Sequence, residues 1–467
     1  MKVLAYPLLF SIYLGLALGY IPGLRMSRAS IVMAGAALLL ALGILNLNQA
    51  WEALDPNTLV FLFGVMVINA HLAFAGFFQL SIERLLWLAK SPFGLLVTLT
   101  LGSGILSALF LNDTIALILT PLVLNLCLTL SLNPIPYLLA LAGATNVGSV
   151  ATLTGNPQNI LIGSFSRISY LEFAQALTPV ALVSLFLQIG LLYLLYPEVR
   201  SRQPLPSLPP LRYRVHQALL TKGLLVTGGL LLAFLLGYPL AQGALIAAGL
   251  LLITRRVKPE RTFARVDWEL LLLFSGLFIV TRAVDELNLL GNVSILTKTP
   301  ITMLVLTAIL SNAISNVPTV LLLYRFVPQG DTQGWLLLAA ASTLAGNLTI
   351  LGSVANIIVA EASAKQGYRL SFLEHLRFGL PLTLLTLLVA YYWLYYRWLT
   401  YSSGADSGVA YSTGASGNGC TGVGSGCTGT GDRSTGADDG CTGTGDRSTG
   451  ADGGASGFNF EGCGALC

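Results

Sequence analysis

Four short polar runs interrupt long apolar stretches of this 467-residue chain. They are Asn112-Asp113-Thr114, TLTGNPQN at 152–159, SNAISNVP at 311–318 and NLTILGSVAN at 347–356. The runs are rich in Gly, Pro, Asn, Ser and Thr, which unwind a helix and then satisfy the freed backbone groups. A helix broken at mid-membrane offers N–H groups and partial positive charge that suit an anion. Its exposed carbonyls, with Asn and Thr oxygens, suit a sodium ion or a proton carrier.

The candidate site consists of the residues that such breaks would present to a solute. They are Asn112, Asp113, Thr114, Thr154, Gly155, Asn156, Asn159, Ser315, Asn316, Asn347, Gly352, Ser353 and Asn356. One asparagine from each run is a candidate sodium ligand, namely Asn112, Asn156, Asn316 and Asn356. The alternative is that Gly and Pro only kink or pack the helices. Recurrence of the breaks, each with its Asn, at matching places in both halves of the chain favours a binding site.

Asp113 is the only carboxylate in the four runs. An ionisable side chain at membrane depth is costly, which makes a role in handling the coupling ion or a proton the functional hypothesis. The alternative is that Asp113 caps a helix beginning at Thr114, since Asp is a favoured cap. The residue types leave both interpretations open.

Long apolar segments must position these runs. The chain is 54% hydrophobic and only 10% charged, with a mean hydropathy of +0.75, which is typical of a polytopic membrane protein. Ten segments are long enough to cross a bilayer: 3–20, 30–47, 57–78, 137–165, 171–196, 218–236, 240–254, 268–283, 335–364 and 372–399. Two further segments, 92–132 and 299–327, carry polar residues at their middle and are predicted to be re-entrant hairpins.

The two sets of segments form an internal repeat. LVFLFGVMVINAH at 59–71 aligns with LLLLFSGLFIVTR at 270–282, and three further pairs of blocks follow in the same order. Five crossings per half give the halves opposite orientations. The predicted fold is therefore an all-α polytopic membrane protein with two inverted-topology repeats, each of five transmembrane helices plus a re-entrant hairpin, with helices broken at mid-membrane. The repeats span 1–197 and 218–400, and a cytoplasmic linker spans 198–217.

Basic residues predict the orientation. The clusters at 200–222 and 255–265 are both cytoplasmic only if the N-terminus is outside. Arg25 and Arg28 then fall on the cytoplasmic side as well. We expect a multi-pass protein of the plasma (inner) membrane with extracytoplasmic N- and C-termini.

Residues 401–467 form a Gly/Ser/Thr/Asp-rich tail in which CTGTGDRSTGADDG repeats almost unchanged. This composition cannot bury a core and predicts disorder. The cysteines lack the pairing with His that a zinc site requires, and the sequence contains neither a nucleotide-binding loop nor a basic, aromatic-rich patch for nucleic acid. We therefore expect no enzyme activity and no cofactor other than a coupling sodium ion or proton.

The sequence resembles a known superfamily at these same runs. NDTIALILTP, TNVGSVATLTGNPQN, SNAISNVP and AGNLTILGSVAN are similar to segments of the ion transporter superfamily. That group includes arsenite permeases, D-type sodium/proton antiporters and citrate-transporter-like divalent-anion/sodium symporters. The resemblance implies an inverted-repeat fold with a scaffold and a mobile transport part that holds the hairpins. The symporters bind carboxylate and sodium with paired Ser-Asn-Thr signatures, whereas the matching places here, Asn112-Asp113-Thr114 and Ser315-Asn316-Val317, are closer to the permease and antiporter branch.

The function predicted is secondary active transport of a small arsenite-, sulfate- or carboxylate-like anion, coupled to sodium or protons by alternating access. A sodium/proton antiporter is the nearest alternative. The membrane subunit of an ATP-driven anion pump, with a soluble ATPase as partner, and a passive channel are alternatives of other classes. The expected partners are the anion and the lipid bilayer, and the sequence is compatible with a homodimer.

Overall fold

The computed structural model describes residues 2–19, 21, 23–201, 203–205, 215–291, 297 and 299–405, and every regular element among them is a helix. In the first half these are α1 (Lys2–Leu18), α2 (Arg28–Ala41), α3 (Leu47–Ala53), α4 (Pro56–Ala75), α5 (Phe77–Leu88), α6 (Pro92–Leu109), α7 (Asn112–Thr129), α8 (Ile135–Ser149), α9 (Pro157–Ser166), α10 (Tyr170–Leu195) and the short 3-10 helix η1 (Pro197–Arg200).

The second half contains α11 (Gln217–Leu235), α12 (Leu240–Leu252), α13 (Pro259–Phe263), α14 (Trp268–Glu286), α15 (Pro300–Ile314), α16 (Asn316–Leu323), η3 (Tyr324–Phe326), α17 (Thr332–Ala345), η4 (Ile350–Gly352), α18 (Val354–Ala364) and α19 (Phe372–Ala405). Within the described part of the chain, six helices are long and apolar enough to cross a bilayer: α4, α6, α7, α10, α11 and the apolar part of α19.

Each predicted span contains a helix, with local differences. The segments 137–165 and 335–364 are each two helices separated by a break, as α8 with α9 and α17 with α18. The helices α3, α5 and α13 are additional, and α2 ends at Ala41 rather than continuing to residue 47. The middle of the predicted linker (206–214) and the predicted disordered tail from residue 406 onward lie outside the described residues.

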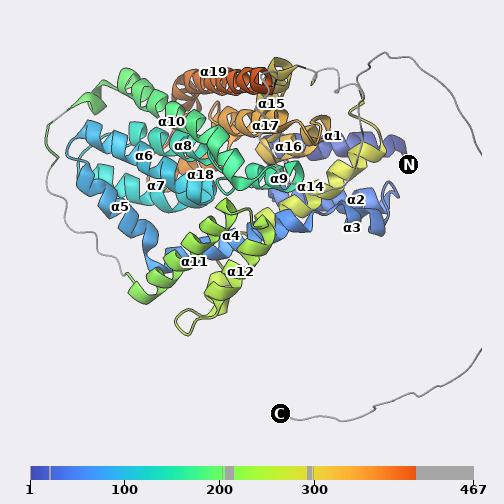
Figure 1. The fold of residues 1–467 in the computed structure, drawn as a ribbon, viewed down its shortest axis with the longest axis horizontal. Coiled ribbons are helices and arrows are strands. Elements are labelled where there is room, and N and C mark those ends of the chain that lie inside the picture. The colour runs from blue at the N-terminus through green and yellow to red at the C-terminus, as the bar shows by residue number, and fades with distance from the viewer. Residues whose placement is uncertain are drawn as a thin grey trace, which may run out of the picture. The chain divides into compact units, whose positions relative to one another are not determined.

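The two halves pack against each other in a reciprocal way. The helix predicted as the second span of each half contacts the helix predicted as the third span of the other, as α2 with α14 and α12 with α4. The helices that follow the breaks after α6 and α15 also contact the other half, because α7 packs against α18 and α16 packs against α9. Figure 1 shows α9, α16 and α18 near the centre of the helical bundle, where these contacts meet.

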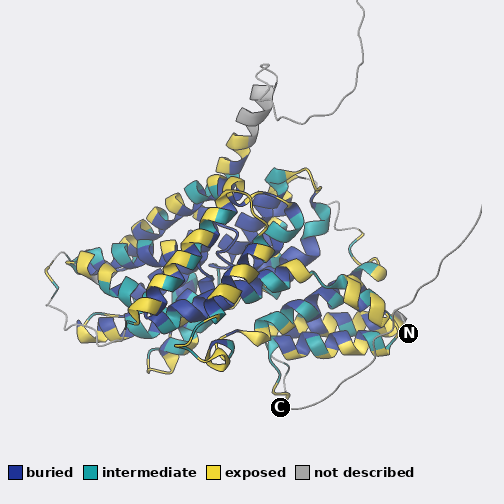
Figure 2. Ribbon diagram, turned by 60° about the horizontal axis from the view of Figure 1, so that its bottom comes forward, coloured by how far each residue is buried: buried dark blue, intermediate teal, exposed yellow. Residues whose placement is uncertain are grey.

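The helices α8 and α17 form the buried centre. Every residue of α8 from Pro136 to Ser149 is buried, and so is every residue of α17 from Trp335 to Ala345. A helix that is buried on all sides needs small residues where its neighbours approach. A Cβ added at Gly148 would lie only 2.1 Å from the carbonyl oxygen of Gly104 in α6, so the two backbones meet directly. Figure 2 shows the buried residues running through the middle of the bundle and the exposed ones along its outer faces.

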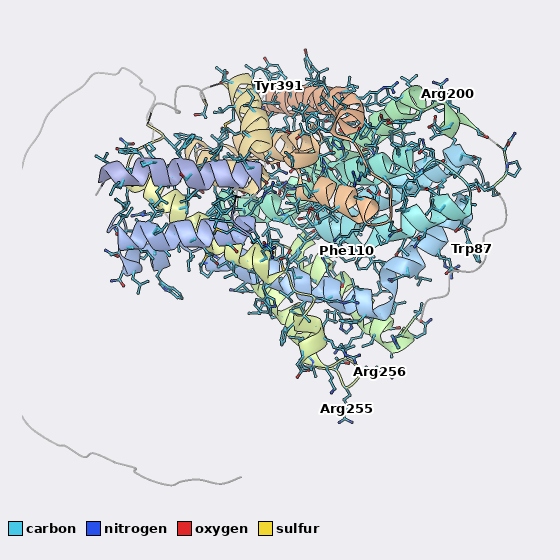
Figure 3. The ribbon with its side chains drawn as sticks, turned by 180° about the vertical axis from the view of Figure 1, so that it is seen from behind. Trp87, Phe110, Arg200, Arg255, Arg256 and Tyr391 are labelled. Carbon is cyan, nitrogen blue, oxygen red and sulfur yellow. The ribbon has the colours of Figure 1, made fainter. Side chains whose placement is uncertain are left out.

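Arginine residues mark parts of the periphery, whereas a cluster of aromatic residues lies inside the helical bundle. Arg255 and Arg256 project from the loop after α12, and Arg200 lies at the opposite edge of the view in Figure 3. Phe110, by contrast, lies among the helices at the break between α6 and α7. Its ring makes edge contacts with Phe77 and Phe78, with centroids 5.5 and 5.6 Å away. This aromatic cluster packs the start of α5 against the tip of the first predicted hairpin.

Candidate solute-binding site

The helix breaks occur at the four polar runs. Helix α7 begins at Asn112 after two non-helical residues, and α9 begins directly after its N-cap, Asn156. In the second half, α16 begins at Asn316, and α18 begins directly after Ser353. The predicted interruptions of the apolar segments are therefore confirmed.

Two equivalent asparagines hold the breaks open by the same hydrogen bonds. Asn159 Nδ2 donates to the backbone carbonyls of Ser149 and Thr152, ten and seven residues upstream, both at 3.0 Å. Asn356 Nδ2 donates to the carbonyls ten and seven residues upstream of it, at 2.8 and 3.1 Å. These carbonyls lose their helical partners at the break, and an unpaired buried carbonyl is costly. Asn159 and Asn356 thus stabilise the unwound backbone.

Asn146 in α8 connects the breaks of the two halves. Its Nδ2 donates to the Oδ1 atoms of Asn347 and Asn356, at 2.9 and 3.1 Å. Its Oδ1 accepts from Asn112 Nδ2 at 3.2 Å and from Ser353 Oγ at 2.8 Å. Asn146 was not among the sequence candidates, because small and apolar letters surround it. A single Asn in the middle of a long apolar segment is the sequence signal that could have identified it, because a buried polar side chain needs hydrogen-bond partners.

The first residues of α7 and α16 contact the other breaks through glycines. Asn112 N donates to the carbonyl of Gly155 at 2.9 Å. In the orientation that satisfies its neighbours, the Asn316 amide donates to the carbonyl of Gly352 at 3.1 Å and accepts from Gln158 Nε2 at 3.3 Å. Gly155 leaves no room for a side chain, since an added Cβ would lie 2.3 Å from the Ser149 carbonyl oxygen. Both glycines are therefore part of the framework of the site.

A cavity of about 40 Å³ lies where the four breaks meet. All four contribute to its wall, through Asn112, Asp113, Gln158, Ser315, Asn316 and Ser353. The first turns of α7, α9, α16 and α18 consequently border one space, and each adds the partial positive charge of a helix N-terminus. This volume accommodates a few water molecules or a small group of atoms from a solute.

The other sequence candidates lie behind this wall. Thr114 Oγ1 accepts from Asn69 Nδ2 at 3.3 Å, and Thr154 Oγ1 lies 3.1 Å from the hydroxyl of Tyr170. Asn156 Nδ2 donates to Ser149 Oγ at 2.9 Å. These side chains, together with Gly155, Asn159, Asn347, Gly352 and Asn356, position the wall and are absent from the cavity lining.

Two charged side chains line the cavity. Asp113, in the first turn of α7, is half-buried and makes neither an ion pair nor a side-chain hydrogen bond with a described residue. It does not cap a helix beginning at Thr114, because α7 begins at Asn112 and its N-cap position, Leu111, has no side-chain cap. Arg28, at the start of α2, is the second charge, and the sequence interpretation had placed it only among the cytoplasmic basic residues.

The backbone at Ser315 is in an unusual conformation. Its φ of 80° and ψ of 160° lie in a region that is essentially restricted to glycine. Ser315 joins α15 to α16 and lines the cavity. Strain of this kind persists only where the surrounding structure enforces it, and it collects at ligand sites.

The four candidate sodium ligands are mostly occupied by protein donors. Asn156 Oδ1 accepts from Asn159 N at 2.8 Å, and the oxygens of Asn356 and Asn316 accept from other side-chain amides. Asn112 Oδ1 is buried and has no hydrogen-bond partner among the described residues. A sodium ion at these residues would share or displace the present donors, and its binding stays a prediction.

Comparison with known proteins adds to this geometry. The sequence pattern that describes the citrate transporter family matches residues 16–345. The silicon efflux transporter LSI3 of Oryza sativa subsp. japonica is 30% identical over 78% of this chain and 91% of its own length. The inner membrane protein YbiR of Escherichia coli is 30% identical over 73% of this chain and 89% of its own, and the putative transporter arsB of Dictyostelium discoideum is 25% identical over 78% and 87%.

A solved structure supports the fold. The YdaH transporter of Alcanivorax borkumensis superposes with a TM-score of 0.50 at 17% sequence identity, covering 86% of this chain and 98% of that one. The resemblance to the ion transporter superfamily is confirmed by these matches. The chain belongs to the citrate transporter family and is a multi-pass membrane transporter rather than an enzyme.

Proposed function

We propose that this protein is a secondary active transporter that moves a small anion through the cavity at the four helix breaks. The observation that carries the proposal is the convergence of four helix N-termini on one space that also contains the unpaired carboxyl group of Asp113. Helix N-termini attract an anion through their free N–H groups and dipoles. A carboxyl group beside them repels the same anion unless it is protonated.

This arrangement favours a proton as the coupling ion. Protonation of Asp113 removes a negative charge from the cavity wall and strengthens anion binding, so proton and anion binding are linked. A sodium ion would have to compete with the hydrogen bonds that already occupy most of the Asn oxygens. Proton-coupled movement of the anion is the form of the proposal that the contacts support best.

The proposal includes two inverted repeats, at 1–197 and 218–400, that move by alternating access. The reciprocal packing of α2 with α14 and of α12 with α4 supports a two-fold relationship between the halves. The matched hydrogen bonds of Asn159 and Asn356 support it further. In this scheme α6 and α15 begin the two hairpins, and the parts that contain the hairpins move against the remaining helices. The N- and C-termini would both lie on the extracytoplasmic side of the inner membrane.

Flux into proteoliposomes that contain the full-length protein tests the function. We expect an anion such as sulfate, phosphate or citrate to accumulate only under an imposed pH or sodium gradient, and we expect the pH gradient to be the effective one. Sodium uptake driven by an opposing proton gradient, without any anion, would instead establish a sodium/proton antiporter. Flux that needs a soluble ATPase and ATP would establish a pump subunit, and conductance without coupling would establish a channel.

A further inference from the structure

Arg28 is a cation in the wall of the cavity, and it forms no ion pair with a described residue, Asp113 included. It is half-buried and lines the same space as Asp113, Ser315 and Ser353. None of its five N–H donors bonds to a described residue. Removing a guanidinium partly from water without a partner is unfavourable. A ligand that supplies the missing acceptors would offset this cost.

The placement of Arg28 within α2 is also unfavourable by itself. It is the first residue of the helix, where the positive end of the dipole disfavours a cation. The exposed residue Arg25, three positions earlier, has no such constraint and does not line the cavity. The unfavourable free energy at Arg28 therefore follows from its half-buried position at the start of α2. It does not follow from the general excess of basic residues predicted on the cytoplasmic side of the membrane.

The guanidinium of Arg28 lies beside the end of α1. A Cβ built at Gly19, just beyond the last residue of α1, would lie 3.6 Å from both Nε and Nη2 of Arg28. The side chain thus rests against the carbonyl end of that helix, where the dipole stabilises a cation. Its N–H donors make no hydrogen bond with a described residue in this position and are available to a ligand.

We infer that Arg28 is a specificity-determining residue that binds a negatively charged oxyanion in the cavity and discriminates against uncharged oxyacids. The inference rests on the proposed function and adds to it the charge class of the substrate. A guanidinium forms paired, charge-assisted hydrogen bonds with planar or tetrahedral oxyanions. The N-termini of α16 and α18 provide further N–H groups on the same wall. An uncharged oxyacid gains far less from this cationic wall.

Uptake kinetics of paired substrates test the inference. Proteoliposomes with wild-type protein, Arg28→Gln, Arg28→Lys and the control Arg25→Gln would be assayed with sulfate, phosphate and citrate as anions and silicic acid as an uncharged oxyacid. We expect Arg28→Gln to raise the KM for the transported anion by about tenfold or more, as the loss of a charge-assisted hydrogen bond implies. Arg28→Lys should recover part of the affinity, and Arg25→Gln should behave like the wild type.

Binding without transport separates a folding defect from a lost contact. In detergent, the transported anion should raise the melting temperature of the wild type and of Arg25→Gln, and it should not raise that of Arg28→Gln. An Arg28→Gln protein with unchanged KM and unchanged stabilisation by the anion would overturn the inference while the proposed function stands. A wild-type protein that transports silicic acid but none of the anions would overturn both the inference and the anion assignment.

Discussion

Asn146 in α8 donates a hydrogen bond from Nδ2 to Oδ1 of Asn356 in α18, over 3.1 Å and across 210 residues of sequence. The contact joins the broken helix of one half of the chain to that of the other. Both side chains are completely buried, so each lost hydrogen bond would leave a polar group without water. The position of the break in one half is therefore sensitive to the position of the break in the other.

The first prediction concerns this link. Asn146→Ala removes the partner of four side chains, and we expect it to lower the free energy of unfolding by at least about 1–3 kcal/mol and to reduce transport strongly. Thermal unfolding in detergent and proteoliposome uptake measure the two effects. Asn125→Ala, on an exposed position of α7, is the control and should change neither. Equal behaviour of the two variants would show that the link is dispensable.

The second prediction concerns coupling. Asp113→Asn should abolish the pH dependence of anion affinity, because the amide cannot release a proton. In the wild type the affinity should fall as the pH rises, since the deprotonated carboxylate repels the anion. The KM measured at several pH values tests this expectation. Glu52→Gln, at an exposed position of α3, should retain the wild-type profile, and a pH-dependent Asp113→Asn would exclude this carboxyl as the proton site.

The third prediction concerns the strained backbone between α15 and α16. Ser315→Gly should stabilise the protein relative to Ser315→Ala, because glycine adopts φ of 80° and ψ of 160° without the clash of a Cβ. Both variants lack the hydroxyl, so their comparison isolates the backbone. We expect a difference of about 1–3 kcal/mol, seen as a higher melting temperature for the glycine variant. Identical melting temperatures would mean that residue 315 is free to relax.

The fourth prediction concerns the contact between α6 and α8. Gly148→Ala should destabilise the protein by about 1–3 kcal/mol or more, because the new methyl group would overlap the carbonyl of Gly104. Gly190→Ala is the matched control, since a Cβ at this position of α10 meets no atom within 4 Å. It should leave the melting temperature unchanged or raise it slightly, as alanine favours the helix. A Gly148→Ala protein as stable as the control would contradict the close approach of the two helices.

The sequence by itself determined the membrane class, the helical segments and the positions of the breaks. These features depend on local properties, because apolar length sets a span and a run of Gly, Asn, Ser and Pro interrupts it. The breaks before Asn112 and Asn316 could therefore be predicted from the residue types alone, and so could membership of the superfamily.

Only the tertiary structure decided which of the candidates face the cavity and which support it. Asn146 and Arg28 lie at the site because segments far apart in the chain pack together. No local sequence pattern encodes this packing. Asn159 was predicted as a ligand but bonds to backbone carbonyls behind the wall, because the break itself creates carbonyls that need donors. The direction in which a side chain points depends on how the helices cross, and that is fixed by contacts between the two halves rather than by spacing within either one.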